Sequence, residues 1–250
     1  MVKENLKQKK LSPSKEIAYI AVTCALLLGG QFVFSFVVGV EVVTLILVCF
    51  SFTFGARRGV ICAVCFSLLR CVIYGFYPTV VILYLIYYPL LALIFGLIGK
   101  CENFSSPLCA AVVNILLVSI ALACAVCYFT DVIRIAKAFA VTIKILLWVI
   151  FSICSVLCII YDLIYFSSVS AKDEILKVVL VASVGAVMTA LFTLMDDVIT
   201  PLFWGYTPLT ALAYFYSSFM AMLPQIICTV VTVSTLFLPL SAVFKKIYSL

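Results

Sequence analysis

The sequence predicts an all-α protein, a polytopic bundle of about eight transmembrane helices. Hydrophobic residues make up 67% of its 250 positions and charged residues only 10%, which leaves too few polar groups to cover a soluble domain. The apolar residues form long unbroken runs, which favour membrane helices over the alternating pattern of a β-barrel. The net charge of +6 comes from basic residues in short loops, a pattern that sets membrane orientation and does not indicate nucleic-acid binding.

A polar, lysine-rich tail over residues 1–16 precedes the first predicted span, over residues 17–40. This apolar run is too long for the core of a signal peptide and has no clear cleavage site, so we expect it to be retained. The second run covers residues 42–54. As a helix it is about 20 Å long, which is short for a span unless flanking residues extend it or the membrane thins around it.

Four more spans follow in the middle of the chain. The first of them contains Arg70 and ends at the turn Gly75-Phe76-Tyr77-Pro78. A charged connector over residues 130–137 separates the last two. The four spans are predicted over residues 60–76, 79–98, 108–129 and 138–166.

The C-terminal part begins with a predicted span over residues 175–195 and a polar, aromatic stretch over residues 196–208. The apolar run that follows is longer than one span needs. We therefore expect a short interfacial helix over residues 209–216 and the last span over residues 218–240. No soluble domain is predicted, and residues 17–246 form a single transmembrane domain.

Eight crossings place both chain ends on one side of the membrane. If that side is the cytoplasm, the outer connectors carry only Arg134 and Lys137. This is the positive-inside asymmetry of multi-pass proteins, and it predicts cytoplasmic termini. The basic residues of the inner loops are Arg57, Arg58, Lys100, Lys172, Lys177, Lys245 and Lys246.

Small residues recur every four positions in the first span, at Ala21, Ala25 and Gly29, and therefore share one helix face. In a bilayer such a face lets another backbone approach closely. We expect Ala21 and Ala25 to contact a partner protein and Gly29, which lies deeper, to pack inside the bundle.

Arg70 lies about two helical turns inside the predicted outer surface, where an arginine is costly unless it meets a carboxylate, a carbonyl or water. Two interpretations stay open. In one, Arg70 meets an anionic or polar ligand in a cavity open to the outside. In the other, it forms a structural pair with a carboxylate of Glu41, Asp196 or Asp197.

Asp196 and Asp197 are an acidic pair beside a predicted membrane face. In one interpretation, they bind a metal ion or a phosphate group. In the other, they mark a helix end that meets water. The second interpretation is favoured because no further carboxylate stands near and the chain has no histidine, so no metal site is predicted.

Aromatic residues crowd the same outer side, and a membrane-interface belt accounts for most of them. The loop Trp204-Gly205-Tyr206 has the composition of a cover that holds a flat ring by stacking. Gln225 follows Pro224, whose ring frees a nearby carbonyl group, and is a further ligand candidate. The predicted substrate-binding residues are Arg70, Tyr74, Tyr77, Tyr84, Tyr88, Asp197, Trp204, Tyr206 and Gln225.

No catalytic motif appears in the chain. The absence of histidine removes the commonest acid–base group and metal ligand, and no glycine-rich phosphate loop is present. We therefore predict neither an enzyme nor an ATPase, and no cofactor. The twelve cysteines lie almost wholly in apolar runs and are interpreted as small hydrophobic residues.

The chain begins with a basic tail, which a first helix with an Ala-xxx-Ala step follows. A short second helix, an arginine-bearing third helix and an aromatic fourth helix come next. This order resembles the substrate-binding S components of energy-coupling factor (ECF) transporters. The segments that carry the resemblance are Ala21–Ala25, Phe54–Gly59, Tyr74–Pro78, Phe95–Lys100 and Thr210–Leu240.

The resemblance implies a six-helix core that binds a vitamin or related micronutrient from outside, in a bacterial cell membrane. It implies that Ala21 and Ala25 dock to a transmembrane T component, which two ABC ATPases drive. Residues 101–166 then form an inserted helix pair, which brings the count to about eight helices.

Two other functional classes stay open. One is a stand-alone ion-coupled carrier, for which Arg70, Lys144 and Asp162 are the candidate intramembrane charges. The other is a membrane enzyme that acts on a lipid-linked substrate through Asp196 and Asp197.

Overall fold

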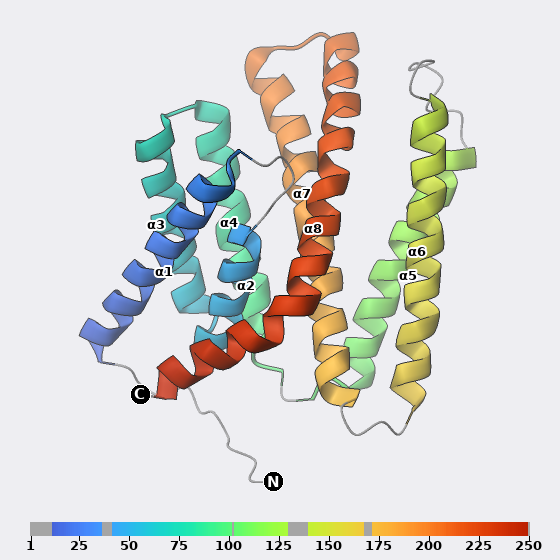
Figure 1. Cartoon of the computed structure of the whole chain (residues 1–250). Coiled ribbons are helices and arrows are strands. Elements are labelled where there is room, and N and C mark those ends of the chain that lie inside the picture. Colours follow the sequence, from blue (N-terminus) through green and yellow to red (C-terminus); the bar gives the residue numbers. More distant parts are fainter. Residues whose placement is uncertain (1–11, 37–41, 102, 130–139, 168–171, 250) are drawn as a thin grey trace. The chain divides into compact units, whose positions relative to one another are not determined.

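The computed structural model describes residues 12–36, 42–101, 103–129, 140–167 and 172–249 (Figure 1). These residues form eight α-helices and no β-strand, so the all-α fold predicted from the sequence is confirmed. The helices are α1 (Pro13–Phe34), α2 (Val42–Phe54), α3 (Ala56–Tyr74), α4 (Pro78–Ile98), α5 (Pro107–Phe129), α6 (Ala140–Phe166), α7 (Lys172–Trp204) and α8 (Pro208–Ser249).

Five helices in the described part of the chain are long and apolar enough to cross a membrane. They are α1, α4, α7, the Pro107–Val126 part of α5 and the Pro208–Tyr248 part of α8. Large apolar side chains also cover their outer faces, and Val22, Phe32 and Leu108 are 60%, 61% and 74% exposed. A bilayer, unlike water, is a favourable solvent for such a surface. The chain is therefore a multi-pass membrane protein, while crossings by α2, α3 and α6 stay a prediction.

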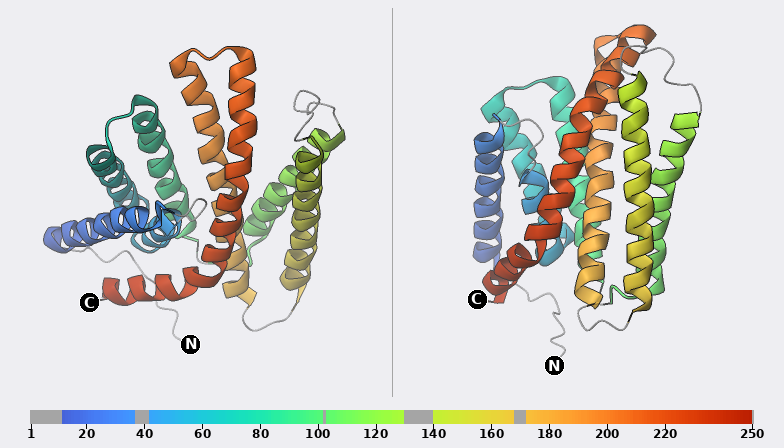
Figure 2. Two further views of the ribbon diagram at one scale, coloured as in Figure 1. Left: turned by 45° about the horizontal axis from the view of Figure 1, so that its top comes forward. Right: turned by 45° about the vertical axis from the view of Figure 1, so that its right-hand side comes forward.

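The chain divides into two compact units. Unit 1 comprises residues 1–101 and 185–250, with α1 to α4, the later part of α7 and α8. Unit 2 comprises residues 102–184, with α5, α6 and the first part of α7. Within unit 2, α5 and α6 pack side by side (Figure 2). The Asn114 amide of α5 donates to Asp162 of α6 over 2.8 Å, from Nδ2 to Oδ1.

Helix α2 is the centre of unit 1. It packs against α1, α3, α4 and α8, and its residues Leu47, Val48, Cys49 and Phe50 are fully buried. A helix that is hydrophobic on every side belongs in a core. The shortness of the second apolar run is consistent with these surroundings, because ten of its 13 residues are buried.

Helix α4 approaches the turn between α2 and α3 so closely that two of its glycines have no room for a side chain. A Cβ built at Gly96 would lie 2.8 Å from the Cβ of Ala56, and one built at Gly99 would collide with the carbonyl group of Phe52. Small residues allow this kind of backbone contact between membrane helices.

The C-terminal third differs from the prediction in two respects. Helix α7 does not end near residue 195 but continues to Trp204. The predicted short helix over residues 209–216 is wrong, because α8 runs unbroken from Pro208 to Ser249. Only residues 205–207 separate the two helices, with Gly205 at a φ of 62° that glycine adopts without strain.

Most polar groups that suggested a loop form hydrogen bonds inside the α7–α8 pair, although Asp197 Oδ1 is buried without a partner among the described residues. The Thr200 and Tyr214 hydroxyl groups both donate to Asp196 over 2.7 Å. Ser218 Oγ donates to Asp197 over 2.8 Å. Because these hydrogen bonds replace water, the helix continues through residues that would otherwise mark its end.

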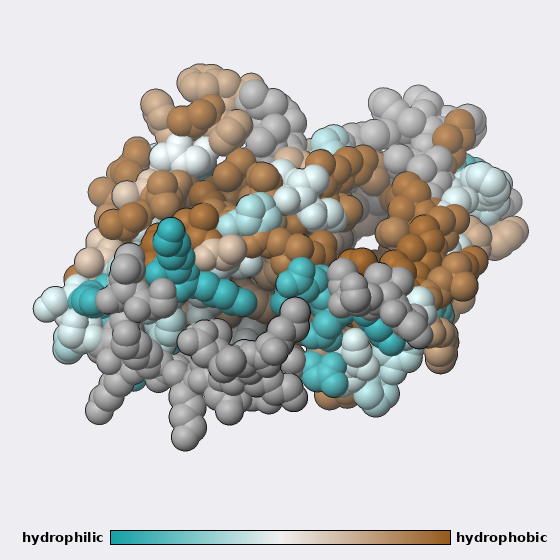
Figure 3. Space-filling view, turned by 60° about the horizontal axis from the view of Figure 1, so that its bottom comes forward, coloured by the Kyte–Doolittle hydropathy of each residue, from teal (hydrophilic) through white to brown (hydrophobic). Residues whose placement is uncertain are grey.

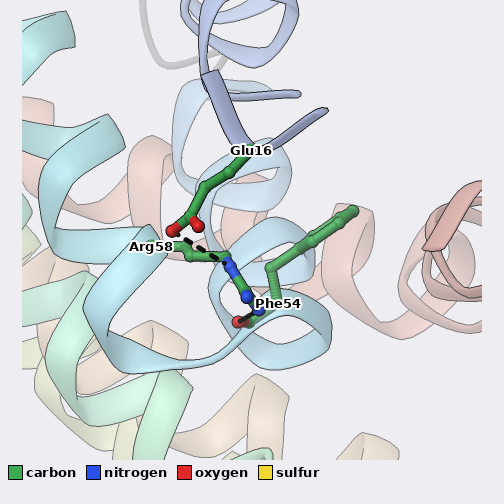
Figure 4. Close-up of polar contacts among 3 residues, drawn as sticks. All are labelled: Glu16, Phe54 and Arg58. Carbon is green, nitrogen blue, oxygen red and sulfur yellow. Dashed lines mark hydrogen bonds and ion pairs between the residues drawn. The ribbon is translucent and has the colours of Figure 1, made fainter. Parts of the chain in front are cut away.

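Unit 1 has a basic end, at which α1 begins and α8 ends. The Tyr19 hydroxyl of α1 donates to the carbonyl oxygen of Ile247 in α8 over 3.2 Å. Arg58 at the start of α3 pairs with Glu16 and donates to the carbonyl oxygen of Phe54 (Figure 4). Figure 3 looks at this end and shows hydrophilic residues gathered there among hydrophobic ones. The basic residues are Lys15, Arg57, Arg58, Lys100, Lys245 and Lys246.

The opposite end of unit 1 consists of the turns over residues 75–77 and 205–207, and we call it the turn end (Figures 1 and 2). The third predicted span is slightly displaced here. Helix α3 stops at Tyr74 rather than at Phe76, because Gly75 adopts a φ of 100°.

Candidate ligand-binding site

Arg70 lies near the turn end of α3 and carries polar groups without a partner. Its Nε and Nη1 atoms are buried and donate to no acceptor within the described residues. The guanidinium carbon lies 4.5 Å from the ring centre of Tyr84 and 5.2 Å from that of Tyr74. Such cation–π contacts stabilise the charge by about 0.5–2 kcal/mol, but they leave the N–H groups unsatisfied.

Two adjoining helices hold this arrangement in place. Tyr74 is one helical turn beyond Arg70 on α3 and therefore lies on the same face. Tyr84 reaches Arg70 from α4, and the Ser67 hydroxyl of α3 donates to the carbonyl oxygen of Tyr84 over 3.0 Å. This bond ties α3 to α4 beside the guanidinium group.

An aromatic cluster surrounds the Tyr84 ring. Its ring centre lies 4.9 Å from that of Tyr88 and 5.8 Å from that of Phe192, which α7 contributes. Phe66 packs against Tyr88 in an edge-on geometry at 5.1 Å. Tilted and edge-on contacts are the favoured arrangements of aromatic rings, so Tyr84 has a fixed position. Phe192 is a member of the site that the sequence analysis missed.

Gln31 of α1 is a second residue that the sequence analysis missed. Its Nε2 atom donates to the Tyr84 hydroxyl over 3.2 Å, while its Oε1 atom is buried and has no partner in the part of the chain that the structure describes. The signal for it was present, because an amide inside an apolar span is unusual unless it bonds to another helix or a ligand. The first predicted span carries one such residue, Gln31.

The two aspartates do not pair with Arg70. Asp196 accepts hydrogen bonds from Thr200 and Tyr214, and Asp197 accepts one from Ser218. Of the three carboxylates considered as structural partners, Glu41 lies outside the described residues. The described part of the chain therefore supplies no carboxylate to Arg70.

Gln225 and Asp197 belong to a polar seam between α7 and α8 rather than to the group around Arg70. Thr193 Oγ1 donates to Gln225 Oε1 over 3.4 Å, and the hydroxyls of Thr189 and Thr229 lie 3.0 Å apart. Hydroxyl and amide side chains commonly join membrane helices in this way. Of the predicted substrate-binding residues, the structure thus brings together Arg70, Tyr74, Tyr84 and Tyr88.

The remaining predicted aromatic residues lie exposed at the turn end. Tyr77, Trp204 and Tyr206 are 62%, 61% and 37% exposed. Trp204 is the last residue of α7 and packs on Phe203, so its assignment to a loop is corrected. Aromatic residues at the ends of membrane helices match an interface belt.

All three small residues of α1 are exposed, because the buried face of this helix consists of Thr23, Cys24 and Leu27. A Cβ built at Gly29 would meet no atom within 4 Å. The prediction that Gly29 packs inside the bundle is therefore wrong. Ala21 and Ala25 face outward on the same side.

No group of three or more cysteine, aspartate or glutamate side chains within the described residues is placed to hold a metal ion. No protein-family model, no curated protein and no solved structure matches the chain. The chemistry of the site is therefore the evidence on which a function rests.

Proposed function

We propose that the chain is a membrane-embedded substrate-capture subunit, comparable to the S component of an ECF transporter, that binds a small, cyclic, anionic nutrient at Arg70. The observation that carries this proposal is that the Nε and Nη1 atoms of Arg70 are buried and find no acceptor among the residues that the structure describes. An ionisable group inside a membrane domain is rare and is usually functional.

A bound anion supplies what Arg70 lacks. Leaving a buried donor without an acceptor costs about 1–3 kcal/mol, and more for a charged group. A carboxylate or phosphate oxygen accepts hydrogen bonds from a guanidinium group in a short, charge-assisted geometry. The neighbouring rings of Tyr74 and Tyr84 suit a cyclic ligand, because aromatic faces pack well on one another.

The charge distribution of unit 1 supports binding from the outside. Lysines and arginines gather at the basic end, and Arg70 lies one helical turn before the end of α3 that meets the turn end. Basic loops favour the cytoplasmic side of a bacterial membrane, so both termini are cytoplasmic in this proposal and the turn end faces out. The nutrient then reaches Arg70 from outside the cell.

Transport needs an energy source that the sequence does not contain, since it has no phosphate-binding loop. In this proposal a transmembrane T component and two ABC ATPases provide it. The outward-facing Ala21 and Ala25 on α1 support this docking role, because close helix contacts in membranes use small residues.

The proposal is tested by native mass spectrometry of the protein purified from cells in mild detergent. We expect a retained small molecule with an anionic group, and we expect Arg70→Met to lose it. Arg57→Met, which removes an exposed arginine at the basic end, is the matched control and should keep it. Equal retention by Arg70→Met, or a native protein that carries no small molecule, would overturn the proposal.

A further inference from the structure

The site around Arg70 contains an unpartnered acceptor as well as unpartnered donors. Arg70 offers N–H groups from Nε and Nη1, and Gln31 offers its buried Oε1 atom. The hydroxyl of Tyr74 is also buried without a partner within the described residues. These groups come from α1 and α3 and have opposite hydrogen-bonding requirements.

Tyr84 brings the donor and the acceptor together. Its ring lies under the Arg70 guanidinium at 4.5 Å, and its hydroxyl accepts the hydrogen bond from Gln31 Nε2 at 3.2 Å. The Tyr84 side chain is only 8% exposed and is packed among other rings. Gln31 and Arg70 therefore both contact the Tyr84 side chain. Gln31 contacts its hydroxyl group, and Arg70 lies over the face of its ring.

A simple carboxylate satisfies only half of this site. It accepts from Arg70 and Tyr74, but it has no hydrogen to give to Gln31 Oε1. A buried acceptor that loses water without gaining a donor weakens binding. A ligand that carries an N–H or O–H group beside its carboxylate satisfies both sides.

We infer that the ligand is a carboxylate with an adjacent N–H or O–H donor, and that Gln31 selects it by accepting that hydrogen through Oε1. This inference rests on the proposed function, because it names the class of nutrient that Arg70 holds. Gln31 is a specificity-determining residue in this scheme, and Arg70 supplies the general attraction for anions.

Two ring carboxylates of nearly equal shape test the inference. Indole-2-carboxylate has an N–H group beside its carboxylate, and benzofuran-2-carboxylate has an oxygen atom in the same place. Their affinities for the purified full-length protein are measured by isothermal titration calorimetry in detergent. We expect the indole to bind about tenfold more tightly, which corresponds to about one hydrogen bond.

Two variants separate selection by Gln31 from simple support of Tyr84. Gln31→Met removes the acceptor while keeping an unbranched side chain, and it should abolish the preference for the indole. Tyr84→Phe removes the hydroxyl that Gln31 contacts but leaves the Gln31 amide in place. This variant should weaken the binding of both compounds to a similar degree and keep the preference for the indole.

Equal affinities for the two rings, or a preference that survives in Gln31→Met, would overturn the inference and leave the proposed function standing. Failure of both rings to bind would also overturn it, while a small molecule retained by the native protein would still support capture at Arg70. If both compounds bind to Arg70→Met as tightly as to the native protein, the proposed function fails instead.

Discussion

Arg58 and Arg70 lie at opposite ends of α3 and differ in how their charge is satisfied. Arg58 Nε lies 3.2 Å from Glu16 Oε1, and its Nη1 donates to the carbonyl oxygen of Phe54 over 3.2 Å. Its guanidinium carbon also lies 5.9 Å from the ring centre of Tyr248. Arg58 thus connects α1, α2, α3 and α8, whereas the Nε and Nη1 atoms of Arg70 are buried and have no acceptor among the described residues.

The contacts of Arg58 predict a graded loss of stability. The Glu16 contact has the distance of an ion pair but not the alignment of a hydrogen bond. Its side chains are partly exposed, and we expect the pair to contribute about 0.2–1 kcal/mol. Glu16→Gln should lower the free energy of unfolding by that amount. Arg58→Met should cost about 1–3 kcal/mol, because the Phe54 carbonyl group also loses its donor.

Both variants are measured by unfolding in mixed detergent micelles, with Arg57→Met as the control at the same end of α3. A double-mutant cycle isolates the pair energy. If Arg58→Met costs no more than Glu16→Gln, the contacts with Phe54 and Tyr248 contribute nothing.

At the scale of the elements, unit 1 depends on close contact between α4 and the α2–α3 turn. The backbone of α4 at Gly96 lies against Ala56, and at Gly99 it lies against the carbonyl group of Phe52. Because this contact positions α4, it also positions Tyr84 and Tyr88 opposite α3. The site at the turn end is therefore supported by packing near the basic end.

Two Gly-to-Ala substitutions should have opposite effects. Gly96→Ala forces a methyl group against the Ala56 backbone and should destabilise the protein by about 1–3 kcal/mol. Gly29→Ala adds a methyl group in open space and should stabilise α1 by about 0.5–1 kcal/mol, since alanine favours a helix. Thermal unfolding in detergent measures both. A stable Gly96→Ala protein would contradict the close packing of α4.

At the scale of the whole molecule, α1 combines an outward face with a residue of the candidate site. Ala21 and Ala25 face outward, while Gln31 on the same helix bonds to Tyr84. A partner that bound the outward face would therefore contact a helix that also touches the candidate site. This arrangement allows docking and ligand binding to be examined separately in one protein.

Ala21→Trp should prevent docking and leave ligand binding intact. A bulky ring on the small-residue face blocks a close helix contact. The native protein should co-purify with the T component and the ATPases of the same genome, and Ala21→Trp should not. Leu93→Trp on α4, at a side chain that is 41% exposed, is the matched control and should co-purify. Loss of the small molecule in Ala21→Trp would contradict a role restricted to docking.

The approximate positions of the eight helices were predictable from the sequence, although a ninth, short helix over residues 209–216 was predicted and is absent. Each follows from an apolar run, which can be recognised locally in the sequence. Such a run forms a helix in a bilayer, because a helix satisfies its backbone polar groups internally. The end of α7 was not predictable in the same way. Asp196 looks like the end of a helix until Thr200 and Tyr214 are found to satisfy its carboxylate.

The candidate site was predictable only in part. Arg70 was identified because a charge inside an apolar run is conspicuous, and Tyr84 and Tyr88 because they share a helix face. Phe192 and Gln31 were missed, since they come from helices far away in the sequence. Their contacts with Tyr84 depend on how α1 and α7 are rotated about their axes.

The sequence by itself determined that this protein is a multi-pass helical membrane protein with a basic side and an isolated arginine in its third helix. The tertiary structure alone decided that Arg70 lies between tyrosine rings with no carboxylate from the described residues, and that Gln31 contacts the same Tyr84 side chain. The physical reason is that hydrophobicity acts residue by residue along a run. The partner of a hydrogen bond, in contrast, depends on how helices that are distant in the chain pack together.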